Sequence, residues 1–200
     1  MFDLNQYLNH WTSFSPRANA FPWEVIQDIR ARIGAVVQQL DGGGYSIKED
    51  IAIHTTATIE AGSVIKGPVV ISAGCFVGAH AYLRGGVFLG PDTSIGPGSE
   101  VKASIILQDS ALAHFNFVGD SIIGSHVNLE AGAVLANHYN EREDKIIRVM
   151  VDDRMIITGV DKFGSLIGDH SRIGANAVLS PGTILPVRSI VSRLALVQQC

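Results

Sequence analysis

The chain has 200 residues, a length that suits one domain with a substantial hydrophobic core. Hydrophobic residues make up 46% of it and charged residues 17%, which excludes an intrinsically disordered chain. The formal net charge of −4 leaves no extended basic surface, so neither nucleic acid nor a membrane is expected as a partner.

The cellular compartment is predicted from the cysteines and from the N-terminal stretch. Cys75 and Cys200 are far apart and lie in no metal-binding spacing, which favours a reducing compartment. The stretch MFDLNQYLNHWTSF lacks the charged and apolar regions of a signal peptide, and no run reaches the length of a membrane span. We therefore expect a cytoplasmic protein.

The first predicted element is a helix at about 22–40, inside an N-terminal segment of residues 1–44. Apolar residues recur at helical spacing through FPWEVIQDIRARIGAVVQQL, with a proline near the start and DGGG after the end. Repeat proteins use terminal capping elements to shield the open end of their core. We expect this capping helix to lie across the open first coil.

A six-residue repeat dominates the second predicted segment, residues 45–200. Eleven positions from Ile53 to Ala113 fall at steps of six, and all but Ala113 hold Ile, Leu or Val. Period six suits very short strands joined by tight turns, and such hexapeptide repeats are typical of parallel β-helices. Stacked coils then pair as parallel strands. A sandwich with accidental spacing is the alternative, and eleven positions in one phase argue against it.

The repeat changes phase in the stretch ALAHFNFVGD. When the interior positions are counted in steps of six from Ile53 to Ala113, the next two steps, to Val118 and then to Ile123, are five residues each. A missing residue changes the direction of side chains at a corner, as bulges do near active sites. A harmless deletion is the alternative. His114 follows a predicted interior residue, so its side chain is expected to point outward.

The phase is lost again at about 140–166 and resumes at Ile167. Within this break, KIIRVMV and RMIITGV flank DD, a pattern that predicts a hairpin thrown out of the coil stack. Long excursions from repeat scaffolds often carry binding surface.

One stretch of the sequence resembles one branch of the left-handed β-helix acyltransferases. It runs from AYLRGG through SEVKASIILQDSALAHFNFVGDSIIGSHVNLEAGAVLANH. That branch is the acetyltransferase domain of the bifunctional N-acetylglucosamine-1-phosphate uridyltransferase/glucosamine-1-phosphate acetyltransferase, with related sugar-1-phosphate nucleotidylyltransferases. The resemblance is specific across about 82–138. It implies an all-β fold: a left-handed parallel β-helix of hexapeptide repeats with an N-terminal helical cap and one extruded hairpin loop. It also implies a homotrimer and acetyl-CoA as co-substrate.

The resemblance implies roles for ten residues and no metal ligand. His114 is the implied catalytic base, with Glu100 or Asn137 orienting its imidazole. Arg84 and Lys102 hold the acceptor's phosphate. The other implied contacts are Phe117 and Asn128 with the acceptor, and Ala131, Ala175 and Arg193 with coenzyme A.

The residue types agree with N-acetyl transfer to a phosphorylated amine. A histidine titrates near neutrality, so it can accept a proton from an amine. Arg84 and Lys102 are 18 residues apart, which places them at the same outward position on adjacent coils. Two cations so close repel unless an anion lies between them, which favours a phosphate site. Two solvated side chains are the alternative.

Several alternatives stay open. Phe117 and His138 stand where the family usually has tyrosines, so the acceptor is either an amino-sugar phosphate or a nucleotide-linked amino sugar. A non-catalytic trimeric scaffold descended from a sugar nucleotidyltransferase is the second function. A zinc-dependent γ-type carbonic anhydrase, with His114, His126 and His138 as ligands, is less favoured because the phase slips between the first two. Uridylyl transfer is not expected from these residues.

Overall fold

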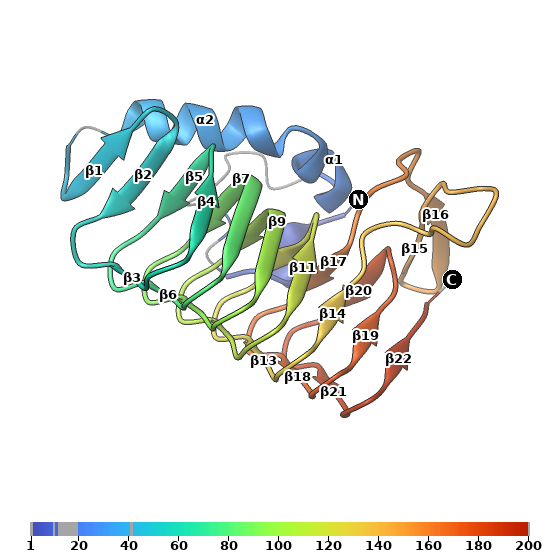
Figure 1. Cartoon of the computed structure of the whole chain (residues 1–200). Coiled ribbons are helices and arrows are strands. Elements are labelled where there is room, and N and C mark those ends of the chain that lie inside the picture. The colour runs from blue at the N-terminus through green and yellow to red at the C-terminus, as the bar shows by residue number, and fades with distance from the viewer. Residues whose placement is uncertain (1, 10, 12–19, 41, 200) are drawn as a thin grey trace.

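The computed structural model describes residues 2–9, 11, 20–40 and 42–199. Its strands wind into a parallel β-helix with three walls, and the coils stack from β2 at one end to β22 at the other (Figure 1). The predicted all-β fold class is confirmed. We name the walls A, B and C in the order in which the chain visits them in each coil.

Each wall is a ladder of short parallel strands. Wall A contains β2 (Ile51–His54), β5 (Val69–Ile71), the ends of β7 (Tyr82–Leu89) and β9 (Glu100–Ile106), β12 (Ile122–Ile123), β17 (Ser165–Ile167) and β20 (Thr183–Leu185). Wall B contains β3 (Thr58–Ile59), β6 (Phe76–Val77), β8 (Ser94–Ile95), β10 (Ala111–Leu112), β13 (Asn128–Leu129), β18 (Arg172–Ile173) and β21 (Ile190–Val191). Wall C contains β4 (Val64–Lys66), the starts of β7 and β9, β11 (Phe117–Gly119), β14 (Val134–Leu135), β19 (Val178–Leu179) and β22 (Leu196–Val197).

The interior of the coils is an aliphatic core. Each wall strand sends one Ile, Leu or Val inward, and in the central coils these side chains, such as Leu89, Ile95 and Val101, have no exposed surface. Residues in register on successive coils pack on one another, so the hexapeptide repeat becomes three continuous aliphatic columns.

The phase of the repeat shifts earlier than the sequence predicted. Ile106 and Leu112 occupy the interior, whereas Leu107 belongs to a second cluster outside the coils and Ala113 is half-buried. The assignment of Leu107 and Ala113 to the interior was therefore wrong. The run of three aliphatic residues that ends at Leu107 concealed the shift.

The physical cause is the corner between walls C and A. Two glycines separate Arg84 from Val87, but only Ala103 separates Lys102 from Ser104, so the register shifts by one residue there. The two steps of five residues lie at this one corner, on successive coils, rather than on both sides of Val118.

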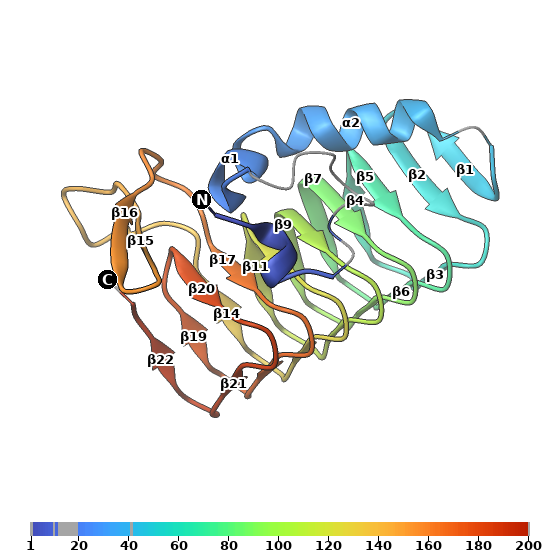
Figure 2. The ribbon, with the colours of Figure 1, turned by 180° about the vertical axis from the view of Figure 1, so that it is seen from behind.

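A second hydrophobic cluster covers the outside of wall A. The helices α1 (Pro22–Gln27) and α2 (Ile29–Gln39) and the short helix η1 (Leu4–Gln6) contribute to it, and α2 runs along the wall (Figures 1 and 2). Ile29, Ile33 and Val37 lie on one face of α2 and are buried with the outward wall residues Val70 and Ile105.

The helix expected at about 22–40 is thus present as two helices, but α2 does not lie across the open first coil as expected. The strand β1 (Tyr45–Lys48) pairs antiparallel with β2 at that end, and the interior residues Ile53, Ile59 and Ile65 stay only partly buried. The outward aliphatic residues of wall A explain the difference, because they offer the apolar face of α2 a larger dry surface than the rim of one coil.

The predicted hairpin is confirmed. β15 (Arg148–Val151) pairs antiparallel with β16 (Arg154–Ile157), and Asp152 and Asp153 form the turn with positive φ. The excursion leaves the stack at the corner between walls C and A and returns at Gly164, whose N–H donates to the Asp120 carbonyl. No helix in the described part of the chain is long and apolar enough to cross a membrane.

Gly86 fixes the place where α2 begins. Its φ is +99°, and a Cβ there would lie 3.1 Å from the Arg30 amide nitrogen. We expect Gly86→Ala to lower the free energy of unfolding by about 1–3 kcal/mol, from backbone strain and displacement of the helix. Chemical denaturation measures this change.

Gly34, inside α2, is the matched control. A Cβ there would meet nothing within 4 Å, so Gly34→Ala should raise the free energy of unfolding by about 0.5–1 kcal/mol through helix propensity alone. Equal effects of both substitutions would contradict the contact assigned to Gly86.

Candidate active site

One edge of wall C, its corner with wall B, carries four of the residues singled out in the sequence. Gly132 N–H donates to the His114 carbonyl, Asn176 N–H to the Ala131 carbonyl, and Leu194 N–H to the Ala175 carbonyl, each at 2.9 Å. These bonds stack successive coils in register. We call the residues they align the His114 column: His114, Ala131, Ala175 and Arg193.

His114 lies in the turn that follows β10, and its side chain is exposed, as expected. It comes two residues after the interior Leu112 rather than directly after an interior residue. Its ring lies 6.3 Å from that of Phe115, the corner residue with positive φ. Among the described residues, no side chain hydrogen-bonds to the His114 imidazole, so neither implied orienting residue contacts it within one chain.

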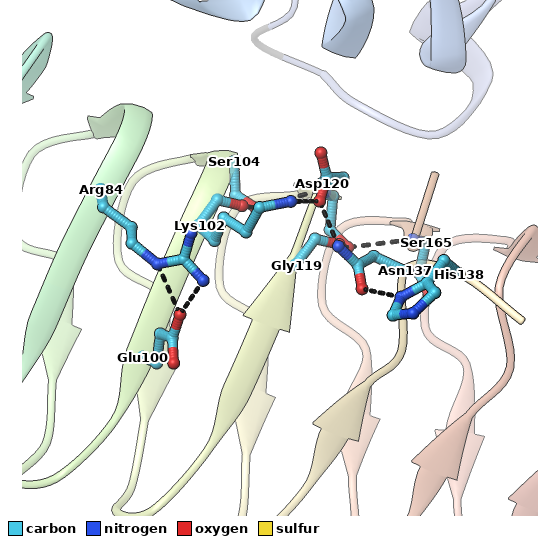
Figure 3. A network of polar contacts seen from close by, with 10 residues as sticks. Arg84, Glu100, Lys102, Ser104, Gly119, Asp120, Asn137, His138 and Ser165 are labelled. Carbon is cyan, nitrogen blue, oxygen red and sulfur yellow. Dashed lines mark hydrogen bonds and ion pairs between the residues drawn. The ribbon is translucent and has the colours of Figure 1, made fainter. Parts of the chain in front are cut away.

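The other edge of wall C, its corner with wall A, carries the polar network of Figure 3. Arg84 and Lys102 lie in register on adjacent coils, as the 18-residue spacing predicts. Arg84 donates to Glu100 Oε1 from Nε at 2.8 Å and from Nη2 at 2.6 Å. Lys102 Nζ lies 2.5 Å from Asp120 Oδ2, and the Asn137 amide also donates to Asp120.

We call Arg84, Lys102, Asp120 and Asn137 the Arg84 column, in which Asp120 lies one residue past the register of the two cations because Gly119 pairs with Lys102. The structure contradicts the expectation that its two cations need an external anion, because Glu100 and Asp120 already pair with them. Glu100 is thus a partner of Arg84, and Asn137 a partner of Asp120.

Asp120 is a site residue that the sequence analysis missed. Its side chain is only 11% exposed, and it binds Lys102 and Asn137 from the short turn after Gly119. An 18-residue step from Lys102 reaches Asp120, but the coil there is one residue shorter, so Gly119 is in register with Lys102 and spacing alone does not place Asp120.

The two implied acceptor contacts lie on different walls. Phe117 faces outward on wall C, in register with Glu100, between the two columns. Asn128 faces outward on wall B, in register with Arg172, and borders a groove that also contains Glu130 and Arg193. One chain therefore does not bring Asn128 to the same face as Phe117.

Arg193 is engaged by a carboxylate. Glu130 Oε2 accepts from Arg193 Nε at 2.8 Å and from the Ala175 amide at 2.9 Å, and Oε1 accepts from Arg193 Nη2 at 3.0 Å. These hydrogen bonds, that of Arg193 first, lower the pKa of Glu130 to about 2. A coenzyme A phosphate would have to compete with Glu130 for this guanidinium.

The histidines of the zinc alternative lie at three different corners. His114 follows a wall B strand, His126 follows a wall A strand, and His138 comes after a wall C strand. His126 stacks on His170 with ring centroids 4.8 Å apart and lies 3.8 Å from Asp109. Within the described part of the chain, no three His, Cys, Asp or Glu side chains are placed to share a metal ion.

The coil architecture and its two edge columns define a hexapeptide-repeat β-helix domain of the class found in acetyltransferases. Residues 77–200 match the family described as GMPPB C-terminal domain, and the chain belongs to that family.

Two curated relatives match most of the chain. A bifunctional sugar-1-phosphate nucleotidylyltransferase/acetyltransferase of Sulfurisphaera tokodaii is 33% identical, over 88% of this chain and 43% of that protein. The bifunctional protein GlmU of Methanococcus vannielii is 32% identical, over 84% of this chain and 44% of that protein. The chain thus spans less than half the length of these relatives. A solved perosamine N-acetyltransferase from Caulobacter crescentus is 16% identical, over 82% of this chain and 62% of that one, with a TM-score of 0.31.

The pair formed by Glu130 and Arg193 predicts a pH dependence. Because the pKa of Glu130 is lowered from 4.5 to about 2 in the folded chain, its contribution to stability is complete above pH 4.5 and is lost as the pH falls toward 2. We expect Arg193→Gln to lower the free energy of unfolding near neutrality, and the difference from wild type to shrink over that pH range.

Carboxyl NMR titration and denaturation at several pH values measure both effects. Arg172→Gln, in the same groove, is the control and should leave the Glu130 titration unchanged. An ordinary Glu130 midpoint in the wild-type protein would contradict the assigned pair.

Proposed function

We propose that the chain is an acetyl-CoA-dependent N-acetyltransferase whose acceptor is an amino-sugar phosphate or a nucleotide-linked amino sugar. The observation that carries this proposal is the alignment of His114, Ala131, Ala175 and Arg193 along one edge of wall C. The names of the two curated relatives, which include acetyltransferase activity, support it.

In this mechanism His114 is the general base. Its imidazole takes a proton from the acceptor amine as the nitrogen attacks the thioester carbonyl. The backbone N–H of Ala131 donates to the carbonyl oxygen as negative charge develops there. The carbon–sulfur bond then breaks, and the His114 proton passes to the departing thiolate. No covalent enzyme intermediate is needed.

The Arg84 column positions the acceptor. Glu100 and Asp120 hold the two cations in fixed places before substrate arrives. A phosphate dianion then competes with those carboxylates for Arg84 and Lys102, and a bidentate contact with the guanidinium orients it.

We further propose that the chain acts as a homotrimer. Exposed aliphatic side chains gather where walls B and C meet in the last coil: Ile190 is 68% exposed, Leu194 78% and Leu196 66%. Contiguous apolar surface of this kind mostly marks an interface. A neighbouring copy there would flank the His114 column. Sedimentation should give the mass of three chains, and a stable monomer at micromolar concentration would refute it.

The non-catalytic scaffold remains the second candidate, favoured by the ion pair that closes Arg193 against Glu130. Calorimetric titration with acetyl-CoA separates the two functions, because a pure scaffold has no reason to bind it.

His114→Ala should lower the acetylation rate by roughly 10²–10⁴-fold, the usual contribution of a general base. Folding should survive because the side chain is exposed. Thiol release from acetyl-CoA measures the rate with a panel of amino-sugar phosphates and nucleotide sugars. His126→Ala, an exposed histidine at another corner, is the control and should keep full activity. Near-wild-type turnover without His114 would refute its role.

Arg84→Ala and Lys102→Ala should each raise the acceptor KM about ten- to hundredfold and leave the acetyl-CoA KM nearly unchanged, since each loses a charge-assisted hydrogen bond to phosphate. Lys66→Ala is the matched control, because Lys66 is in register with Arg84 one coil earlier but does not line the cavity above the column. The role fails if an amino sugar and its 1-phosphate have the same KM with the wild-type enzyme.

A further inference from the structure

A cavity of about 450 Å³ lies over the Arg84 column, between the coils and the covering elements. Its floor includes Arg84, Lys102 and Asp120 from the corner between walls C and A. Its roof includes Arg30 from α2 and Lys162 from the returning end of the excursion. The cavity therefore receives cations from three parts of the chain that are distant in sequence.

Some of the cationic side chains that line this cavity have a carboxylate partner, and others do not. Four cationic and two carboxylate side chains line it, in a chain whose formal net charge is −4. The floor cations, Arg84 and Lys102, are held by Glu100 and Asp120. In the described part of the chain no ion pair holds Arg30 or Lys162, although Asp161 also borders the cavity.

Packing and hydrogen bonds hold the backbone at both roof cations, Arg30 and Lys162, in place. Gly86 allows the backbone of Arg30 to approach the corner closely, since a Cβ there would lie 3.1 Å from the Arg30 nitrogen. Lys162 precedes Phe163, which is fully buried, packs edge-on against Trp23 and donates its N–H to the Asn137 carbonyl. The two exposed charges are thus held at the cavity rim rather than on freely moving segments.

We propose that Arg30 and Lys162 form the second half of the anion site, so that this cavity binds a diphosphate group carried by the acceptor. One phosphoryl group faces Arg84 and Lys102, and the other faces the roof. A lone phosphate needs only the floor pair, and the unpaired roof charges are matched by a second phosphate. This inference rests on the proposed function for its acceptor, and coenzyme A is assigned to the opposite edge of wall C.

The test compares inorganic pyrophosphate with inorganic phosphate by isothermal titration of the full chain. We expect wild-type protein to bind pyrophosphate at least about tenfold more tightly, as a charge-assisted contact predicts, and less so at high salt. The double variant R30Q/K162Q should bind phosphate as wild type does and lose the preference. R30K/K162R, which keeps both charges, should retain it.

The control is K48Q/R154Q, which removes one exposed lysine and one exposed arginine away from the cavity. It should leave both affinities unchanged. The proposal is overturned if wild type shows no preference, if R30Q/K162Q keeps it, or if the control loses it equally.

Nucleotide ligands distinguish the sources of the diphosphate. UDP or GDP should follow pyrophosphate across the variants, whereas coenzyme A affinity should not change in R30Q/K162Q. A fall in coenzyme A affinity there would overturn the assignment to the acceptor. Absence of acetyl transfer with every acceptor would refute the proposed function alone, since the pyrophosphate preference is measured without turnover.

Discussion

In-register pairing of each coil with the next is the constraint on which the rest of this structure depends. Backbone hydrogen bonds at the corners hold each residue directly above its counterpart one coil earlier, at the spacing of adjacent strands. Side chains that share a phase therefore form columns. The same rule that stacks the aliphatic core also stacks His114 over Ala131, and Arg84 over Lys102.

The two columns lie on opposite edges of one wall, and in the proposed function this separation divides donor binding from acceptor binding. The corner with wall B presents the small residues Ala131 and Ala175 beside His114, which suits the proposed passage of an extended donor. The corner with wall A presents paired charges beneath a roof, which suits an anion. The aromatic side chain of Phe117 lies on wall C between the two columns.

The sequence predicted the β-helix and the register of Arg84 with Lys102 from spacing, and the hairpin from the two apolar runs that flank DD. Spacing failed where the chain offered several equivalent choices. Ile105, Ile106 and Leu107 are all aliphatic, so which one faces inward is decided by the length of the preceding corner rather than by residue type. The position of α2 was missed for a related reason, since the apolar outer face of wall A is visible only once the walls are assigned.

Partners across the site were the least predictable part. Glu100 or Asn137 was expected to orient His114, yet Glu100 pairs with Arg84 and the Asn137 amide donates to Asp120, because a polar side chain binds whichever partner the coil register brings within reach. The ion pair between Glu130 and Arg193 joins residues 63 apart in sequence and likewise depends on that register. Spacing arguments identify which residues lie in register, but the contacts between their side chains need coordinates.

The hairpin excursion has a consequence for how freely this scaffold can change. Ile123 pairs with Ile167 across a segment of 44 residues, whereas an ordinary coil such as that from Ile167 to Leu185 closes after 18. Loop-closure entropy grows only with the logarithm of length, so the longer closure costs about 0.8 kcal/mol more. Insertions at this corner are therefore nearly neutral for folding, and a chain can acquire or exchange the roof of its cavity while the coils beneath keep their register.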